Sequence, residues 1–220
     1  MEQPLNLSPD SQKPPNLGRK PLEAPSLERF YPTEDIELGI GASDIAETHR
    51  QRHYRRYNTI RDLLVPYIAK TDVIADVGSG SGYGSAILGE RFRYVFGIEP
   101  NDMARAYASK HYPKIKFQSD LEGADVIVMI ESIEHMTKTE VRSYIYDAKV
   151  VAVTTPLIGQ PDNQYHISPF RCPEDVEAAF RREGFVLMES RLEKDITFTT
   201  GELGDQFYGI FGRPLTLKSL

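Results

Sequence analysis

Cysteine is nearly absent from the sequence, because Cys172 is the only one among 220 residues. A lone thiol can form neither an internal disulfide nor a cysteine zinc site, so the composition favours a reducing compartment, and we expect a cytoplasmic protein. Long apolar runs are missing as well. The longest, Val126–Ile130, is far shorter than the ~20 residues that span a bilayer, and the sequence does not open on a basic segment followed by an apolar one. We therefore expect neither a membrane span nor a secretion signal.

An excess of positive charge is also lacking. The 26 Lys and Arg residues are outnumbered by 32 Asp and Glu residues, which gives a net charge of −6 and a pI near 5.5. This balance argues against broad electrostatic binding of nucleic acid. One basic run, His49–Tyr57, holds four arginines. Since a run of charges on a helix is usually a solvated face, nucleic-acid contact is the weaker interpretation of this run.

The composition does suffice for one folded domain. Hydrophobic residues make up 40% of the chain and charged residues 26%, which is ordinary for a globular protein. Seven of the fifteen prolines fall within the first 32 residues, where few large apolar side chains could offset the entropy of ordering. We predict a disordered N-terminal arm over residues 1–26 and a single domain over residues 27–220.

Helical and extended patterns alternate beyond the arm. A helix is expected over Ser43–Ala69, with a break around Pro66. Apolar runs and helical stretches then follow in the order Val73–Val77, Gly82–Arg91, Tyr94–Ile98, Asp102–His111, Ile115–Phe117, Val126–Ile130, Thr137–Tyr146, Val150–Thr154, Pro173–Glu183, Phe185–Glu189 and Gln206–Phe211. This alternation predicts an α/β fold with a Rossmann-like, doubly wound, mostly parallel seven-stranded sheet. The last two runs lack a clear helix between them, so we expect antiparallel pairing at one edge.

The most informative segment is the glycine-rich turn after the first predicted strand. Gly78, Gly80 and Gly82 lack a Cβ, which permits unusual dihedrals and a close approach of a ligand. The second predicted strand ends at Glu99, where a carboxylate can accept two hydrogen bonds from a ribose diol. Turn and carboxylate together predict a site for an adenosine-containing ligand, and the position of Glu99 disfavours a tight turn without any ligand.

The glycine spacing separates two classes of such ligands. A dinucleotide motif, G-x-G-x-x-G, would need glycine at position 83, where the chain has Tyr83. The glycines instead follow as Asp76-x-Gly78-x-Gly80-x-Gly82. This run resembles the first motif of class I S-adenosylmethionine-dependent methyltransferases. The resemblance implies that the acidic residue and the loop hold the methionyl end of the cofactor.

Further motifs extend the resemblance over about residues 27–190. They are Glu28–Pro32, His53–Tyr57, Gly80–Ser85, Glu131–His135, Thr155–Pro156 and Asn163–His166. In this order they resemble a bacterial methyltransferase group often associated with glycan or secondary-metabolite modification. The chain departs from that group in two places: the segment before Ala124 is shorter, and a Gly-Gly turn before Val150 is missing.

The resemblance implies a set of cofactor-binding residues. Asp120 and Leu121 would border the adenine, Met103 would cover its other face, and Arg56 would lie near the cofactor carboxylate under a cover that Tyr57 helps to form. The alternative for Asp120 is a plain turn residue. The full set is Arg56, Tyr57, Asp76, Gly78, Ser79, Gly80, Ser81, Gly82, Tyr83, Glu99, Pro100, Met103, Asp120, Leu121 and Glu131.

A carboxylate and histidine cluster follows the fourth predicted strand. If a helix begins at Glu131, spacings of three and four residues put Glu131, Glu134 and His135 on one face. The E-x-x-E-H pattern resembles that of quinone-biosynthesis O-methyltransferases and small-RNA 2′-O-methyltransferases, in which such a group holds a divalent metal. His166 would then be a fourth ligand, and the oxygen-rich set would suit Mg²⁺ or Mn²⁺.

Two alternatives to the metal stay open. In the first, His135 or His166 is a general base without a metal. In the second, Glu131 and Glu134 cap a helix and His135 packs against the core. The sequence thus predicts a methyltransferase that acts on a hydroxyl of a small molecule or glycan. The rival hypotheses are a metal-assisted RNA 2′-O-methyltransferase, a catalytically silent cofactor-binding partner protein, and a dinucleotide-dependent oxidoreductase. Nothing in the sequence indicates an oligomeric state.

Overall fold

The computed structural model describes residues 44–157, 167–197 and 203–214. The predicted arm over residues 1–26 and the candidate residue His166 lie outside these ranges. Within them, no helix is both long and apolar enough to cross a bilayer.

Seven strands form one sheet with the order β3-β2-β1-β4-β5-β7-β6. Their bounds are β1 Val73–Val77, β2 Tyr94–Ile98, β3 Lys116–Gln118, β4 Val126–Ile130, β5 Val150–Leu157, β6 Val186–Thr197 and β7 Leu203–Gly212. The first five strands pair in parallel, whereas β7 is antiparallel to both β5 and β6. The predicted mostly parallel sheet with antiparallel pairing at one edge is therefore confirmed.

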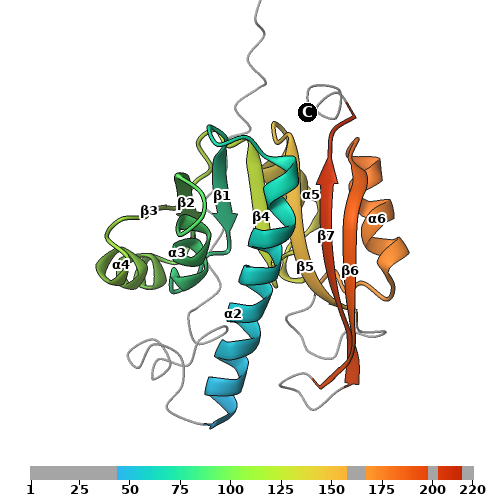
Figure 1. Ribbon diagram of the computed structural model, residues 1–220, viewed down its shortest axis with the longest axis horizontal. Coiled ribbons are helices and arrows are strands. Elements are labelled where there is room, and N and C mark those ends of the chain that lie inside the picture. The colour runs from blue at the N-terminus through green and yellow to red at the C-terminus, as the bar shows by residue number, and fades with distance from the viewer. Residues whose placement is uncertain (1–43, 158–166, 198–202, 215–220) are drawn as a thin grey trace, which may run out of the picture.

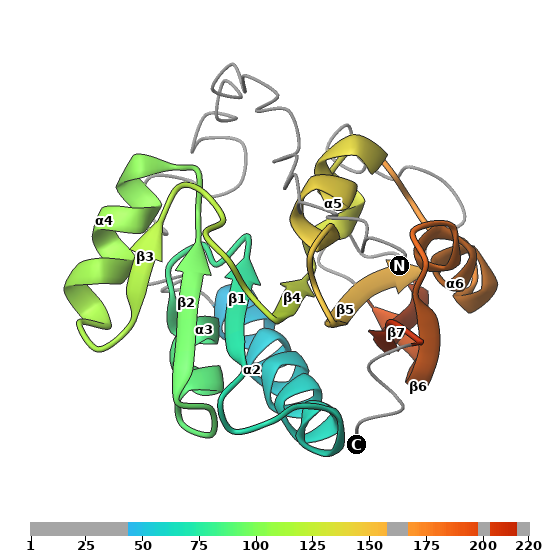
Figure 2. The same ribbon diagram turned by 90° about the horizontal axis from the view of Figure 1, so that it is seen from above.

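Helices cover both faces of the sheet, as the doubly wound topology requires (Figure 2). Their bounds are α2 Asp44–Leu64, η2 Val65–Tyr67, α3 Tyr83–Gly89, α4 Asp102–His111, η3 Ile133–His135, α5 Lys138–Ile145 and α6 Pro173–Arg182. Helices α2 and α3 lie on one side of the sheet, and α5 and α6 lie on the other (Figure 2). The predicted break at Pro66 is confirmed, because α2 gives way there to the 3-10 helix η2.

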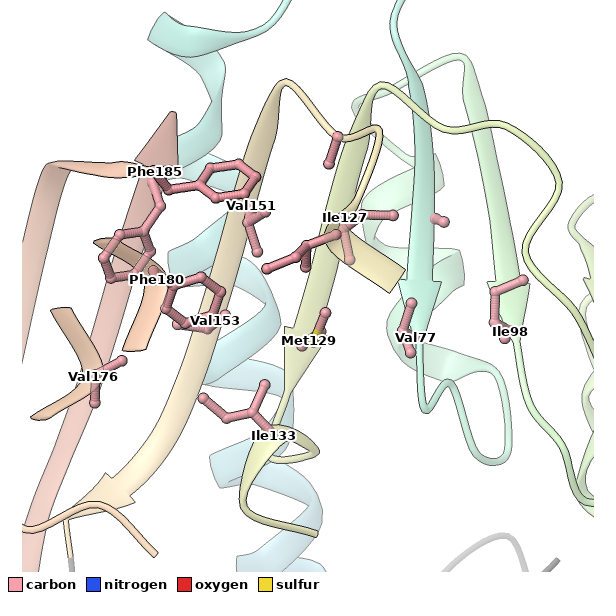
Figure 3. Close-up of a cluster of buried hydrophobic side chains, with 14 of the residues drawn as sticks. Val77, Ile98, Ile127, Met129, Ile133, Val151, Val153, Val176, Phe180 and Phe185 are labelled. Atoms are coloured by element: carbon pink, nitrogen blue, oxygen red, sulfur yellow. The ribbon is translucent and has the colours of Figure 1, made fainter. Parts of the chain in front are cut away.

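The central strands are buried on both faces, which explains their unbroken apolar runs. Every residue of Val126–Ile130 is buried. Ile127 and Met129 point to the side of α5 and α6, where Phe180 of α6 packs in the same core cluster (Figure 3). Val126, Val128 and Ile130 belong instead to the cluster under α2 and α3. This alternation fixes β4 in the middle of the sheet and places its carboxyl end between the two helical layers.

Helix α2 runs obliquely across the sheet on the face that β4, β5 and β7 present (Figure 1). Its buried apolar side chains are Tyr57, Ile60 and Leu64, spaced three and four residues apart. Arg56, next to this stripe, is also buried. Because α2 covers the carboxyl ends of the central strands, its side chains help to shape whatever site forms there.

Candidate functional site

The predicted site residues follow the carboxyl ends of β1, β2, β3 and β4. Strand β1 pairs with β2 on one side and with β4 on the other. The strand order therefore reverses at β1, and open α/β sheets bind their ligands at such a switch point. The glycine turn, Glu99, Asp120 and Glu131 therefore all lie at the carboxyl ends of the parallel strands.

The turn after β1 depends on its three glycines. Gly78, Gly80 and Gly82 have φ values of 79°, 52° and 88°, which residues with a Cβ rarely adopt. The Gly78 N–H donates to the Ile98 carbonyl at 2.9 Å and so holds the turn against β2. A Cβ on Gly78 would lie 3.0 Å from the Ser132 Cβ. The glycines therefore allow the conformation of this turn and its close packing against Ser132, and the binding of a ligand there stays a prediction.

The two serines of the turn have different surroundings. Ser81 is half-buried. Ser79 is buried, and among the residues that the structure describes its hydroxyl finds no hydrogen-bond partner. A buried hydroxyl without a partner is unusual. It provides an unused hydrogen-bonding group at the turn and fits the predicted binding of a polar ligand there.

Glu99 is held in place at the end of β2 by the backbone. Its two carboxylate oxygens accept from the N–H of Gly80 at 2.8 Å and from the N–H of Asn101 at 2.9 Å. Burial raises the pKa of Glu99, and these two backbone hydrogen bonds partly oppose that shift. Each carboxylate oxygen keeps a second lone pair, so the oriented carboxylate can still accept from a ribose diol.

The predicted adenine-binding residues lie beside Glu99. Strands β2 and β3 end in register, with Ile98 opposite Gln118. Asp120, which follows β3, therefore lies at the same end of the strands as Glu99. Asp120 and Pro100 are exposed, Leu121 is half-buried and Met103 is 56% exposed. The Asp120 carboxylate accepts from the Ser119 hydroxyl at 2.8 Å. Their contacts with an adenine ring remain a prediction.

Asp76 lies behind the glycine turn and is fully buried. Its carboxylate accepts from the Ser85 hydroxyl at 2.7 Å and from the Tyr57 hydroxyl at 3.2 Å. Burial raises the pKa of Asp76 to about 7, although the two hydroxyls favour the ionised form and pull the pKa down. The structure thus places Tyr57, which the resemblance put over the cofactor, beneath the turn and against Asp76.

We expect the variant Asp76→Asn to be more stable than the parent at pH 8. Unfolded Asp76 loses its proton near pH 3.8 but folded Asp76 only near pH 7, so the folded state holds more protons between these values and loses stability as the pH rises through them. Asparagine removes this cost but buries an NH₂ group of its own, which leaves a net gain of about 1–2 kcal/mol at pH 8.

Urea unfolding from pH 4 to pH 8 measures this effect. The gain of Asp76→Asn over the parent should shrink as the pH falls from 7 toward 4 and should turn into a loss there, because the cost of the buried NH₂ group does not depend on pH. Asp102→Asn is the matched control because Asp102 is exposed on α4. A difference that stays constant over this pH range would show that Asp76 does not titrate as described.

Aromatic rings of α2 surround Tyr83, which begins α3 directly after the glycine turn. The Tyr83 ring centroid lies 5.1 Å from that of Tyr54, 5.9 Å from that of Tyr57 and 6.4 Å from that of His53. His53, Tyr57 and Tyr83 belong to the predicted motifs, whereas Tyr54, which is 36% exposed, was not predicted as a site residue. The helical spacing from Tyr54 to Tyr57 was the signal that could have shown it.

Arg56 and Glu131 form an ion pair between α2 and the end of β4. The distance from the guanidinium to the carboxylate is 3.1 Å, and the two side chains are only 6% and 13% exposed. The second carboxylate oxygen of Glu131 accepts from the Thr154 hydroxyl at 2.9 Å and from the Gln206 amide at 2.7 Å. The resemblance placed Arg56 near the cofactor carboxylate, whereas the structure pairs it with Glu131. Gln206 was not predicted as a site residue, because it lies 75 residues from Glu131 in the sequence.

Glu131 has an uncommon backbone conformation. Its φ is 52°, in the left-handed region that residues other than glycine seldom occupy. Its N–H still donates to the Thr154 carbonyl at 3.1 Å, so the strand pairing continues to this point. The next residue, Ser132, donates its hydroxyl to the Val77 carbonyl at 3.2 Å. The chain therefore turns sharply at Glu131 and then packs against the glycine turn.

The predicted common face of Glu131, Glu134 and His135 does not exist. The 3-10 helix η3 begins only at Ile133, so Glu131 is outside any helix. Glu134 is buried and accepts from the Thr155 hydroxyl at 3.2 Å, whereas Glu131 binds Thr154. Since consecutive residues of a strand point to opposite faces of a sheet, the two carboxylates diverge. No three His, Cys, Asp or Glu side chains in residues 44–157, 167–197 and 203–214 are placed to hold a metal ion.

The two carboxylates also differ in their electrostatics. Burial raises the pKa of Glu134 well above its ordinary value, and the nearby charge of Glu131 adds to the shift. Glu134 therefore keeps its proton more readily than an ordinary glutamate does, while Glu131 faces the Arg56 guanidinium. His135 is half-buried at the end of η3.

Comparisons with known proteins support the fold. No protein-family model matches the sequence. The protein-L-isoaspartate O-methyltransferase of Petrotoga mobilis is 26% identical over 94 residues, which are 43% of this chain and 40% of that protein. The chain thus matches less than half the length of this curated relative.

Solved structures match over most of the chain. Magnesium protoporphyrin IX methyltransferase from Synechocystis PCC 6803 with bound S-adenosylmethionine (SAM) has a TM-score of 0.61 at 13% identity and covers 79% of this chain and 85% of its own. Geranyl diphosphate methyltransferase in complex with SAM has a TM-score of 0.61 at 14% identity, covering 80% and 93%. A SAM-dependent methyltransferase from Methanosarcina mazei has a TM-score of 0.55 at 17% identity, covering 69% and 96%. The chain therefore has the fold of the class I SAM-dependent methyltransferases.

Proposed function

We propose that the protein is a SAM-dependent methyltransferase that transfers a methyl group to a hydroxyl of a small molecule or sugar. The observation that carries the proposal is the glycine turn with its three left-handed glycines beside the backbone-oriented carboxylate of Glu99. The hydroxyl of Ser79, which has no hydrogen-bond partner among the described residues, adds a polar group at the same place. Similar folds with bound SAM support the choice of cofactor.

In this function the chain mainly binds the cofactor and the acceptor, orients them toward each other and excludes water. SAM supplies a methyl group on a positively charged sulfur, which an acceptor oxygen attacks in line as the carbon–sulfur bond breaks. Glu99 would accept hydrogen bonds from the ribose hydroxyls. The ring of Tyr83 and the inner face of α2 would close the methionyl side against water. Glu131, whose charge is balanced by Arg56, and Asp76, whose pKa is raised to about 7, would border that side.

The acceptor hydroxyl must lose a proton as it attacks, and we assign this proton to His135. It follows β4 at the carboxyl end of the strands, where the site forms, and a neutral imidazole nitrogen can accept a proton. Glu131 and Glu134 are directed to opposite faces of β5 by Thr154 and Thr155. These carboxylates do not fit a shared metal ion, so the proposed reaction does not use one.

Replacing Glu99 by glutamine is expected to weaken the binding of S-adenosylhomocysteine at least ~10-fold. The amide keeps the shape of the side chain but loses the negative charge that strengthens the hydrogen bonds from the ribose, and one charge-assisted bond contributes about 1.5–3 kcal/mol. Isothermal titration calorimetry of parent and variant measures the difference. Glu122→Gln is the control, because Glu122 is exposed and pairs only loosely with Lys116 at 3.6 Å.

The same titration tests the function itself. Binding of S-adenosylhomocysteine without binding of NAD supports the methyltransferase proposal, and the opposite result supports the oxidoreductase. If neither compound binds at millimolar concentration, the proposal is wrong. The acceptor class is tested with methyl-labelled SAM and fractions of small molecules and glycans. A labelled ether survives mild base, whereas a labelled ester is hydrolysed, so base-labile label would contradict methylation of a hydroxyl.

A further inference from the structure

Arg56, Glu131, Thr154 and Gln206 form a polar cluster between α2 and the sheet. Gln206 has no role in the proposed chemistry. Gln206 is on β7, is fully buried, and donates its amide NH₂ to the Glu131 carboxylate at 2.7 Å. Within the described part of the chain, its amide oxygen has no hydrogen-bond partner. Burying an amide oxygen without a partner costs folding free energy. An apolar side chain of the same length would avoid that cost, so the amide is poorly explained by packing alone.

The amide acts on a carboxylate that is already held from two other directions. Arg56 of α2 binds one oxygen of Glu131 at 3.1 Å, and Thr154 of β5 donates to the other oxygen at 2.9 Å. Gln206 adds a donor from β7 to the oxygen that Thr154 already binds. Three elements thus fix the Glu131 side chain, and with it the left-handed backbone that has a φ of 52°.

Ser132, the residue after Glu131, contacts the glycine turn and so connects Glu131 to it. Ser132 donates to the carbonyl of Val77, the last residue of β1, at 3.2 Å. The Ser132 Cβ also sits 3.0 Å from where a Cβ on Gly78 would be. A shift of Glu131 would therefore move Ser132 against the turn or away from it. Side chains on β7 and α2 are linked in this way to the loop that would hold the cofactor.

We propose that Gln206 is a positioning residue that acts through Glu131 and Ser132 on the cofactor-binding turn. The inference rests on the proposed function, since it assigns Gln206 a part in SAM binding without direct contact. Left-handed conformations of residues other than glycine persist where their surroundings hold them, often at functional sites. Here Gln206, Thr154 and Arg56 are those surroundings.

The variant Gln206→Met tests the proposal. Methionine keeps the length of the side chain, removes the donor to Glu131 and removes the unpartnered oxygen. We expect the dissociation constant of S-adenosylhomocysteine, measured by calorimetry, to rise about tenfold. We also expect the thermal unfolding midpoint to stay close to that of the parent. A purely structural role predicts the reverse, namely a lower midpoint and unchanged affinity in the remaining folded protein.

Two threonines of β5 provide a matched pair. Thr154→Val removes a second donor to Glu131 and should also weaken binding, whereas Thr155→Val removes a donor to Glu134 on the other face and should leave the affinity unchanged. Equal effects of the two threonine variants would overturn the proposal, as would an unchanged affinity of Gln206→Met. If the parent itself does not bind S-adenosylhomocysteine, the proposed function fails first, and the inference fails with it.

Discussion

Replacing Arg56 by alanine is expected to lower the free energy of unfolding by about 3–5 kcal/mol, because removal of one partner of a buried ion pair leaves the other charge uncompensated. Arg56 and Glu131 are 6% and 13% exposed at their side chains. In the variant the Glu131 carboxylate would keep its hydrogen bonds from Thr154 and Gln206 but lose the only cation it is paired with among the described residues.

The neighbouring residue gives the control for this prediction. Arg55 also pairs with a glutamate, Glu193, at 3.1 Å, but the arginine side chain is 65% exposed. Exposed pairs contribute roughly 0–1 kcal/mol, so Arg55→Ala should change little. Urea unfolding followed by circular dichroism compares the two variants. Neutralising both members of the buried pair, as Arg56→Met with Glu131→Gln, should recover much of the loss. Equal losses from Arg55→Ala and Arg56→Ala would contradict this account.

Replacing Gly84 by alanine is the second change with a large expected effect, a loss of about 3 kcal/mol. Inside a helix, alanine is ordinarily better than glycine by about 1 kcal/mol. In α3, however, a Cβ on Gly84 would lie 2.0 Å from the Cζ atom of the Tyr57 ring. The buried ring cannot swing out without breaking its hydrogen bond to Asp76. The clash would push α2 away from α3 and outweigh the gain in helix propensity.

A double-mutant cycle separates the clash from other effects of the substitution. In a Tyr57→Ala background, Gly84→Ala should not lower the free energy of unfolding. It should raise it by a few tenths of a kcal/mol or more through the higher helix propensity of alanine. Gly89→Ala, at the end of the same helix, is the control, since its Cβ would meet only the flexible tip of Ile115 at 2.9 Å. Thermal unfolding compares the four proteins of the cycle with the control. A cost of Gly84→Ala that persists without the Tyr57 ring would place its cause elsewhere.

Much of the fold could be predicted because the signals are local. The apolar runs Val126–Ile130 and Val150–Thr154 are buried on both faces and carry no competing pattern. The glycine turn was equally predictable, since each of its glycines has a positive φ that the sequence anticipates. The order of the last two strands was not predictable. Periodicity does not tell which of two antiparallel strands lies beside β5, and the structure puts β7 there.

The polar half of the site could not be predicted from local patterns. A helix was expected from Glu131, but the left-handed φ at this residue ends the strand differently, and η3 begins two residues later. Side-chain chemistry gives no warning of such a conformation in a residue other than glycine. The bond from Gln206 to Glu131 joins positions 75 residues apart, and only the folded sheet brings them together.

The place of β7 has a consequence for how the protein assembles during synthesis. Strand β7 leaves the ribosome after all the other strands, yet it pairs with β5 on one side and with β6 on the other. Until it inserts, β5 offers an open row of backbone groups that can pair with another chain. The hydrogen bond from Gln206 to Glu131 also forms only after β7 is in place. We therefore expect nascent chains stalled short of this strand to aggregate readily, and the site to mature only in the last step of folding.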